Sequence, residues 1–278
     1  MRLTQVANKF NTMPVVDAYN PSIKFMAQFD PMSFSKIDGV SVRKRTISIA
    51  PSIQVPPRGC VSIDGQVYLT STPAPDYWKG SVIRKTVVIQ GTDGLAELRS
   101  IAGALRNDAP VTAHTALSFS RYLPEAADSS KYPPQYQLFL AGSESAPAES
   151  LIKLGTDWYL VKESYLSTSG LRIVMANVLA GPVFETINYT SKTYVPTTDS
   201  YSSVVTQVKI LRVKWQEHFN YLTKADESYQ RGDIQVVLLK SAAPGAKASD
   251  TLNLSDGDWR ILSVQDEGET LSLHMRRT

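Results

Sequence analysis

Residues 154–161 read LGTDWYLV and residues 254–262 read LSDGDWRIL. In both segments an apolar residue precedes a short turn that contains glycine, and an aromatic residue then opens a second apolar run. Residues 62–69, SIDGQVYL, have the same form with a tyrosine as the aromatic residue. Glycine in such a turn supplies the positive backbone φ that a tight hairpin needs. The three segments therefore predict three β-hairpins of one kind.

The sequence around these hairpins repeats as well. One β-rich apolar stretch lies upstream of each hairpin and one lies downstream, at residues 46–49 and 82–89, 137–140 and 171–178, and 235–239 and 271–275. The turn glycines Gly65, Gly155 and Gly257 are 90 and 102 residues apart, which is about the length of a small all-β domain. The repeat predicts three related modules in tandem, of which the first diverges most from the others.

We therefore expect an all-β (mainly β) fold of tandem small β-barrel or β-sandwich modules with one short connecting helix. The expected division is an N-terminal arm (residues 1–20), β module 1 (21–92), a connecting helix (93–108), β module 2 (109–181) and β module 3 (182–278).

The helix is predicted between modules 1 and 2, where apolar residues recur at helical spacing. These residues are Leu95, Leu98, Ile101 and Leu105. Asp93-Gly94 would cap the start of the helix, and residues 107–110 would end it. A helix in this place would serve as a connector or a packing element.

The aromatic residues that open the second hairpin strands are Tyr68, Trp158 and Trp259. An aromatic side chain just after the turn is expected to cover the open end of a small barrel, so core or rim positions are favoured over ligand-stacking platforms. In the N-terminal arm, Phe10 and Met13 are candidate contacts with a neighbouring subunit. A tail that caps its own domain explains the arm equally well.

Composition bounds the class of protein. With 42% hydrophobic and 20% charged residues, the 278-residue chain can bury a sizeable core, which excludes wholesale disorder. The net charge of +3 is too small by itself to imply affinity for nucleic acid, and the basic runs 43–45 and 276–277 are expected to be solvated. The single Cys60 excludes an intrachain disulfide and fits a reducing compartment. We expect no membrane span, because no run of about 18 apolar residues occurs.

No contiguous motif for catalysis or cofactor binding occurs in the sequence. The histidines His114, His218 and His274 lack metal-ligand spacing, and both the Gly-x-Ser-x-Gly pentapeptide and the glycine-rich phosphate loops are absent. Acidic residues near Asp256 and Asp266 are better explained as hairpin turns than as a calcium loop. We expect a protein that is not an enzyme and has no cofactor or metal. A carboxylate pair assembled only by folding stays open.

The last module resembles the small β-barrel neck proteins of tailed bacteriophages. The resemblance is carried by residues 232–236, GDIQV, and 256–264, DGDWRILSV, followed by the Gly268 turn and the closing strand 271–275. Residues 136–178 echo it. The family comprises head-completion, stopper and tail-terminator proteins, which assemble as rings between portal and tail. Its members are often one barrel, so three modules suggest a fused or tandem version, and no functional residue carries over.

The resemblance implies a structural virion protein that is synthesised in the host cytoplasm. Copies would pack into a homo-oligomeric ring at the head-to-tail junction, beside portal, neck or tail proteins. Loops at residues 123–134 and 190–203 are expected to extend to the adjoining layers. If the ring encloses DNA, scattered Lys and Arg side chains in its lumen would touch phosphates nonspecifically.

Two alternatives come from other functional classes. The first is a carbohydrate- or receptor-binding β module of a tail or baseplate, in which an exposed tryptophan would stack on the ligand. Its candidates are Trp78, Trp158, Trp215 and Trp259. The second is a hydrolase with noncontiguous carboxylates, which a raised carboxyl pKa in a cleft would favour.

Overall fold

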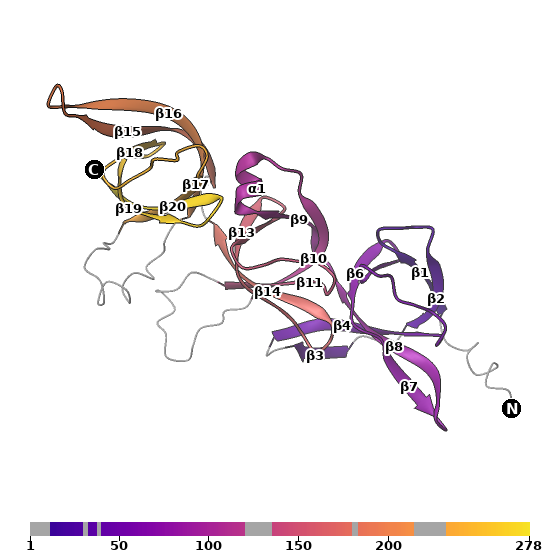
Figure 1. Ribbon diagram of the computed structural model, residues 1–278. Helices are drawn as coiled ribbons and strands as arrows, with labels where there is room; N and C mark the ends of the chain where they lie inside the picture. The colour runs from indigo at the N-terminus through magenta and orange to yellow at the C-terminus, as the bar shows by residue number, and fades with distance from the viewer. Residues whose placement is uncertain (1–11, 30–32, 38–39, 120–134, 180–182, 214–231) are drawn as a thin grey trace, which may run out of the picture.

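The computed structural model describes residues 12–29, 33–37, 40–119, 135–179, 183–213 and 232–278. The described chain forms three closed, six-stranded antiparallel barrels and one short helix. Figure 1 shows the barrels following one another along the molecule in chain order. The prediction of tandem all-β modules with one short helix is confirmed.

Barrel 1 consists of β1 (Thr12–Asp17), β2 (Lys24–Phe29), β4 (Val40–Ile49), β5 (Cys60–Ile63), β6 (Gln66–Thr70) and β8 (Ser81–Gly91). Two further strands extend its sheet, β3 (Ser33–Ile37) beside β4 and β7 (Ala74–Trp78) beside β8. Barrel 2 consists of β9 (Gly94–Ser100), β10 (Val111–Phe119), β11 (Gln135–Ala141), β12 (Ser150–Leu154), β13 (Asp157–Leu166) and β14 (Leu171–Leu179). Barrel 3 consists of β15 (Phe184–Val195), β16 (Ser200–Val213), β17 (Ile234–Leu239), β18 (Thr251–Leu254), β19 (Gly257–Asp266) and β20 (Thr270–Arg277).

The three barrels share one topology. When the six strands of each barrel are numbered in chain order, their order around the barrel is 1-2-3-6-5-4, and strand 4 pairs with strand 1 to close it. In barrels 2 and 3 the fifth strand also carries a β-bulge at the same place, between Val161 and Glu163 and between Ile261 and Ser263. A shared bulge position is a specific feature of a module, so these two barrels are built on one plan.

Barrel 1 begins earlier than the expected module. Residues 12–17 form β1, which pairs with both β2 and β5, so the expected arm of residues 1–20 is wrong over this stretch. Met13 lies in β1 and packs against the core of barrel 1, so it is not available for the predicted contact with a neighbouring subunit. Apolar alternation in a strand that closes a barrel explains this placement. Phe10 lies outside the described residues.

The helix is shorter than predicted and packs elsewhere. Residues 94–100 form β9, and only Ile101–Arg106 form α1, with the Ser100 hydroxyl accepting a hydrogen bond from the Gly103 N–H (3.0 Å) as its N-cap. The prediction failed for Leu95 and Leu98 because β9 pairs with both β10 and β12, and these ladders outweigh local helix propensity. Asn107 ends the helix in the left-handed conformation, as expected. The helix lies within barrel 2 and faces barrel 3.

Barrels 1 and 2 share an apolar junction. It is formed by buried side chains of both barrels, namely Cys60 and Leu69 from barrel 1 and Ala116, Phe139, Ala141, Leu171 and Ile173 from barrel 2. Above this cluster the Arg58 guanidinium lies 3.6 Å from the centre of the Tyr19 ring and bonds to the Glu144 carboxylate of barrel 2 (2.8 Å). A charge-assisted pair and an apolar cluster thus hold the two barrels together.

Barrels 2 and 3 meet through a second apolar cluster. Ala104 and Leu105 of α1 pack with Leu211 and Val237 of barrel 3. The Lys209 ammonium of β16 donates a hydrogen bond to the Ala104 carbonyl oxygen (2.8 Å) at the end of the helix. The same carbonyl also accepts a hydrogen bond from the Asn107 N–H (3.3 Å), and a cation at this end interacts favourably with the negative end of the helix dipole. The junction therefore links α1 to barrel 3 through both packing and a terminal hydrogen bond.

The first junction predicts a strongly protected thiol at Cys60. Burial raises its pKa to about 12, so the native thiol should react with a disulfide reagent at pH 8 on the order of 10³-fold more slowly than the unfolded chain. Absorbance of the released thiolate, followed with and without denaturant, measures this ratio. Because the chain has one cysteine, a rapid native reaction would show that the junction is open.

Candidate interaction surfaces

The longest hairpin of the molecule extends beyond barrel 3. β15 pairs with β18 only at residues 188–190, and β16 pairs with β17 only at residues 210–213, yet β15 and β16 stay paired as far as Val195 and Ser200. Residues 191–207 thus form a two-stranded projection, which we call the β15–β16 arm. Figure 1 shows it reaching past the rest of barrel 3. The loop expected at residues 190–203 is in fact this hairpin.

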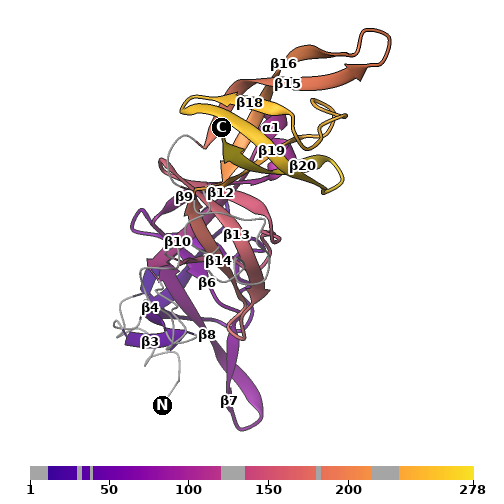
Figure 2. The ribbon, with the colours of Figure 1, turned by 90° about the vertical axis from the view of Figure 1, so that its left-hand side faces the viewer.

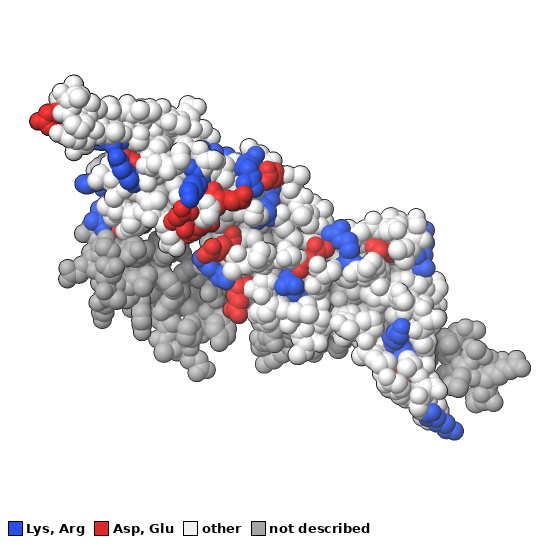
Figure 3. Space-filling view, in the orientation of Figure 1, with Lys and Arg blue, Asp and Glu red and all other residues white. Residues whose placement is uncertain are grey.

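Exposed apolar side chains cover the arm. Tyr201 is 70% exposed, Val205 61% and Val204 59%, while Tyr194 is 47% exposed. Tyr194 lies opposite Tyr201, with ring centroids 5.5 Å apart, and its hydroxyl donates a hydrogen bond to the Asp199 carboxylate (2.6 Å). Cross-strand pairing places Tyr194, Tyr201 and Val205 on one face of the hairpin. In Figure 3 the arm is almost free of charge except for acidic atoms at its tip.

A second hairpin projects at the opposite end of the molecule, as Figures 1 and 2 both show. It joins β7 to β8 through Lys79 and Gly80, whose positive φ angles are those of a tight hairpin turn. Tyr77 and Trp78 are 65% and 61% exposed. Exposed aromatic residues grouped at a hairpin tip are typical of surfaces that contact another molecule.

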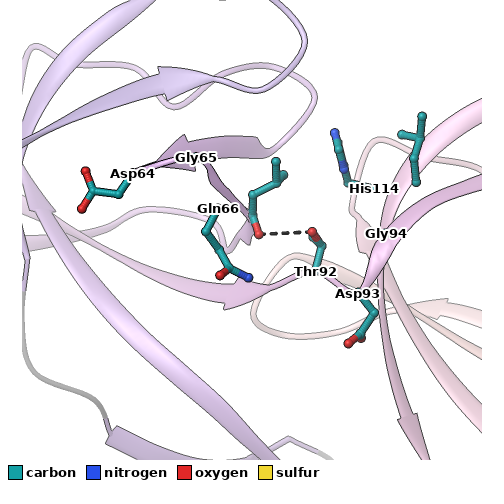
Figure 4. Close-up of a pocket in the computed structure, with 9 residues that line it drawn as sticks. Asp64, Gly65, Gln66, Thr92, Asp93, Gly94 and His114 are labelled. Atoms are coloured by element: carbon teal, nitrogen blue, oxygen red, sulfur yellow. Dashed lines mark hydrogen bonds between the residues drawn. The ribbon is translucent and has the colours of Figure 1, made fainter.

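A shallow depression lies between barrels 1 and 2 (Figure 4). Its lining includes Asp64 of barrel 1 and His114 of barrel 2, which lie on opposite sides, and the Asp64 carboxylate points away from the histidine (Figure 4). Burial, together with Arg58, lowers the pKa of His114. The one hydrogen bond drawn there joins the Thr92 hydroxyl to the Val67 carbonyl (3.2 Å). The lining residues thus form no acid–base pair.

The strand pairing places the predicted hairpin aromatics on two different faces of their strands, Tyr68 and Trp259 on the inner face and Trp158 on the outer face. Tyr68, Tyr159 and Trp259 occupy the same position in their hairpins and are all buried inside their barrels. Trp158 is one residue earlier, so it faces outward and packs edge-on against Phe184 (5.0 Å between ring centroids). A shift of one residue reverses the face of a strand, which is why Trp158 and Trp259 are not equivalent.

The three predicted turn glycines all have positive φ. The angles are +77° at Gly65, +61° at Gly155 and +134° at Gly257. At Gly257 the positive φ favours glycine, and a Cβ atom would lie 3.1 Å from the Arg277 guanidinium, which would have to shift slightly. Gly65 and Gly155 thus lie in the hairpin turns themselves, and Gly257 is the first strand residue after its turn.

Several charged side chains of barrel 3 form ion pairs. The buried Asp233 carboxylate accepts hydrogen bonds from Arg276 (2.9 Å) and lies 2.9 Å from His274. Burial raises the pKa of the Asp256 carboxyl, but hydrogen bonds from Arg212 and Trp259 lower it by more, so the net shift is downward. The expectation of a solvated 276–277 run is therefore wrong for Arg276. Within the described ranges, no three His, Cys, Asp or Glu side chains gather as a metal site.

Among the described residues, one carboxyl has a raised pKa. Partial burial and the neighbouring Glu149 raise the pKa of Glu267, which lies in the exposed turn between β19 and β20. Neither glutamate lines the depression between barrels 1 and 2. His218 and Trp215 lie outside the described residues, so the structure does not test their candidate roles.

Comparison with protein families, with curated proteins and with solved structures found no match to this chain. In the part of the chain that the structure describes, no helix has the length and apolar character needed to span a membrane. The candidate surfaces therefore rest on the geometry of this molecule alone. Among the described residues, the two projecting hairpins carry the most exposed large apolar side chains.

Replacement of Arg58 by alanine should destabilise the protein by about 1–3 kcal/mol, because the mostly buried Glu144 carboxylate would lose its charged partner. Urea unfolding followed by fluorescence measures the change. Arg84→Ala is the matched control, since the Arg84–Asp76 pair lies on the exposed β7–β8 hairpin and should contribute less than about 1 kcal/mol. Equal effects of the two variants would contradict a structural role for the Arg58–Glu144 pair.

Proposed function

We propose that the protein is a structural virion protein of a tailed bacteriophage, which forms a ring-like layer at the head-to-tail junction by subunit packing. The observation that carries the proposal is the β15–β16 arm, a regular hairpin whose apolar side chains are largely exposed. Exposed tyrosine and valine on a preformed hairpin favour contact with a protein surface. Portal, neck or tail proteins would flank the layer.

The body of the molecule supports the same proposal. Closed barrels leave few free sheet edges, so contacts between copies can be confined to the projecting hairpins and the outer faces. The junctions between barrels join the three units into one scaffold that holds the two hairpins at opposite ends (Figures 1 and 2). A subunit of this form can reach neighbours at both ends.

Of the two C-terminal arginines, Arg276 has its charge paired with a carboxylate, so it contributes less to contacts with DNA inside such a ring. Arg276 is bound by Asp233, and Arg277 donates a hydrogen bond to the Asp256 carbonyl oxygen. Contacts with DNA would thus be few and nonspecific, in keeping with the low net charge. The expected loop at residues 123–134 lies outside the described residues and adds no further surface to the proposal.

Immunogold electron microscopy of particles from the source cells tests the function. With an antibody against this chain, label should be confined to the junction of capsid and tail. Label at fibre or baseplate tips would favour a receptor-binding module instead. Particles without any label would overturn the structural proposal, and an antibody against a known capsid protein controls for particle integrity.

The exposed Tyr77 and Trp78 favour a second candidate, a carbohydrate- or receptor-binding module of the tail or baseplate. If this candidate holds, host-surface glycans should quench tryptophan fluorescence saturably, and Trp78→Ala should abolish the quenching. Trp259→Phe, which alters a buried tryptophan, is the control and should leave the quenching in place. Glycans without effect on fluorescence would count against this candidate.

A further inference from the structure

Within the chain, the connection between the first and second strands of one barrel docks onto the next barrel. In barrel 1 this connection holds Tyr19, whose hydroxyl oxygen accepts a hydrogen bond from the His114 N–H of β10 (3.0 Å) and whose ring lies 5.2 Å from that of His114. Tyr19 also packs against the cluster that includes Phe139 of β11. The contacted strands are the second and third of barrel 2.

Barrel 2 repeats this arrangement toward barrel 3. Its connection between the first and second strands is α1, which contacts β16 and β17. Leu105 packs with Leu211 of β16 and Val237 of β17, again the second and third strands of the following barrel. Two successive junctions thus use the same pair of elements, although one connection is a loop and the other a helix.

In barrel 3 the same connection is the end of the β15–β16 arm, and none of the described barrels follows barrel 3. At the other end of the molecule, none of the described barrels precedes barrel 1, so none of them docks onto its second and third strands, β2 and β4. Met26 of β2 is 53% exposed there and lies two residues from the exposed Lys24 on the outer face. The exposed end of the arm and the exposed side chains of β2 therefore correspond to the two parts of one repeated junction.

We infer that the β15–β16 arm of one copy docks onto the β2–β4 face of barrel 1 in a second copy of this chain, head to tail. The apolar residues Tyr201 and Val205 of the arm would cover Met26. Asp199 at the tip of the arm would approach Lys24, which gives the contact a complementary charge at its rim. This inference deepens the proposed function and rests on it, since it names the surfaces that would join the ring.

A contact between two different faces is heterologous, so it repeats from copy to copy. Such an interface closes into a ring when the rotation between copies divides a full turn, and otherwise it continues as a filament. A closed ring has a single mass that does not grow with concentration. The inference therefore predicts a discrete oligomer of the full chain.

Sedimentation velocity of the full chain over a concentration series tests the contact. The wild-type chain should form oligomers, and Val205→Asp should weaken the association at least about 30-fold by burying a charge in the interface. Val111→Asp is the matched control, because Val111 is a strand valine of similar exposure (58%) outside the arm, and it should assemble like the wild type. Slow reaction of the Cys60 thiol verifies that each variant is folded.

Mixing two variants distinguishes head-to-tail docking from contact between two arms. Val205→Asp keeps the receiving face, and Met26→Asp keeps the arm, so each should be monomeric alone while their mixture forms a heterodimer that grows no further. If Met26→Asp assembles like the wild type, the arm docks elsewhere and the inference fails. A mixture that stays monomeric, a control that fails to assemble or a monomeric wild type also overturns it.

The outcomes separate this inference from the proposed function. Oligomers that behave as predicted, from a chain that labels no particle junction, would refute the function and keep the docking geometry. Label at the junction together with normal assembly of Met26→Asp would keep the function and refute the docking site.

Discussion

Closure of each barrel by its first and fourth strands is the constraint on which the rest of the molecule depends. β1 pairs with β5, β9 with β12 and β15 with β18, and each pairing removes the edges along which sheets otherwise join. Once the edges are satisfied, barrels can associate only through outer faces and connections. The two apolar junctions and the Arg58–Glu144 pair occupy those places. The two hairpins that project beyond barrels 1 and 3 therefore carry the exposed apolar groups described above.

The fold class could be read from the sequence because hairpin turns carry local signals. Asp64-Gly65 sets a turn by its own backbone preferences, and apolar alternation marks the strands on either side. Local signals gave the wrong secondary structure where pairing with strands distant in the sequence determines it. Leu95 and Leu98 have helical spacing, yet they lie in β9 because two remote strands pair with it.

The candidate surface was harder to predict than the fold. Residues 190–203 are polar enough to be taken for a loop, and nothing in their composition shows how far β15 and β16 extend past their neighbours. Equating Trp158 with Trp259 failed for a related reason, since the turns of the two hairpins place glycine at different positions. Only the ladder register shows that Tyr159 is the counterpart of Trp259 and that Trp158 belongs to the junction with barrel 3.

Because the three barrels are joined in one chain, their junctions need not be identical, as the interfaces in a ring of separate identical barrels must be. A ring of identical single barrels must use one interface everywhere, so every change to it acts at all contacts at once. Here the chain fixes the order of the barrels, and the two junctions use different contacts. At the first junction an arginine stacks on a tyrosine, and at the second a lysine binds the end of a helix. To a neighbouring layer, such a ring would present three times as many barrels as it has subunits, with similar outlines and different contacts.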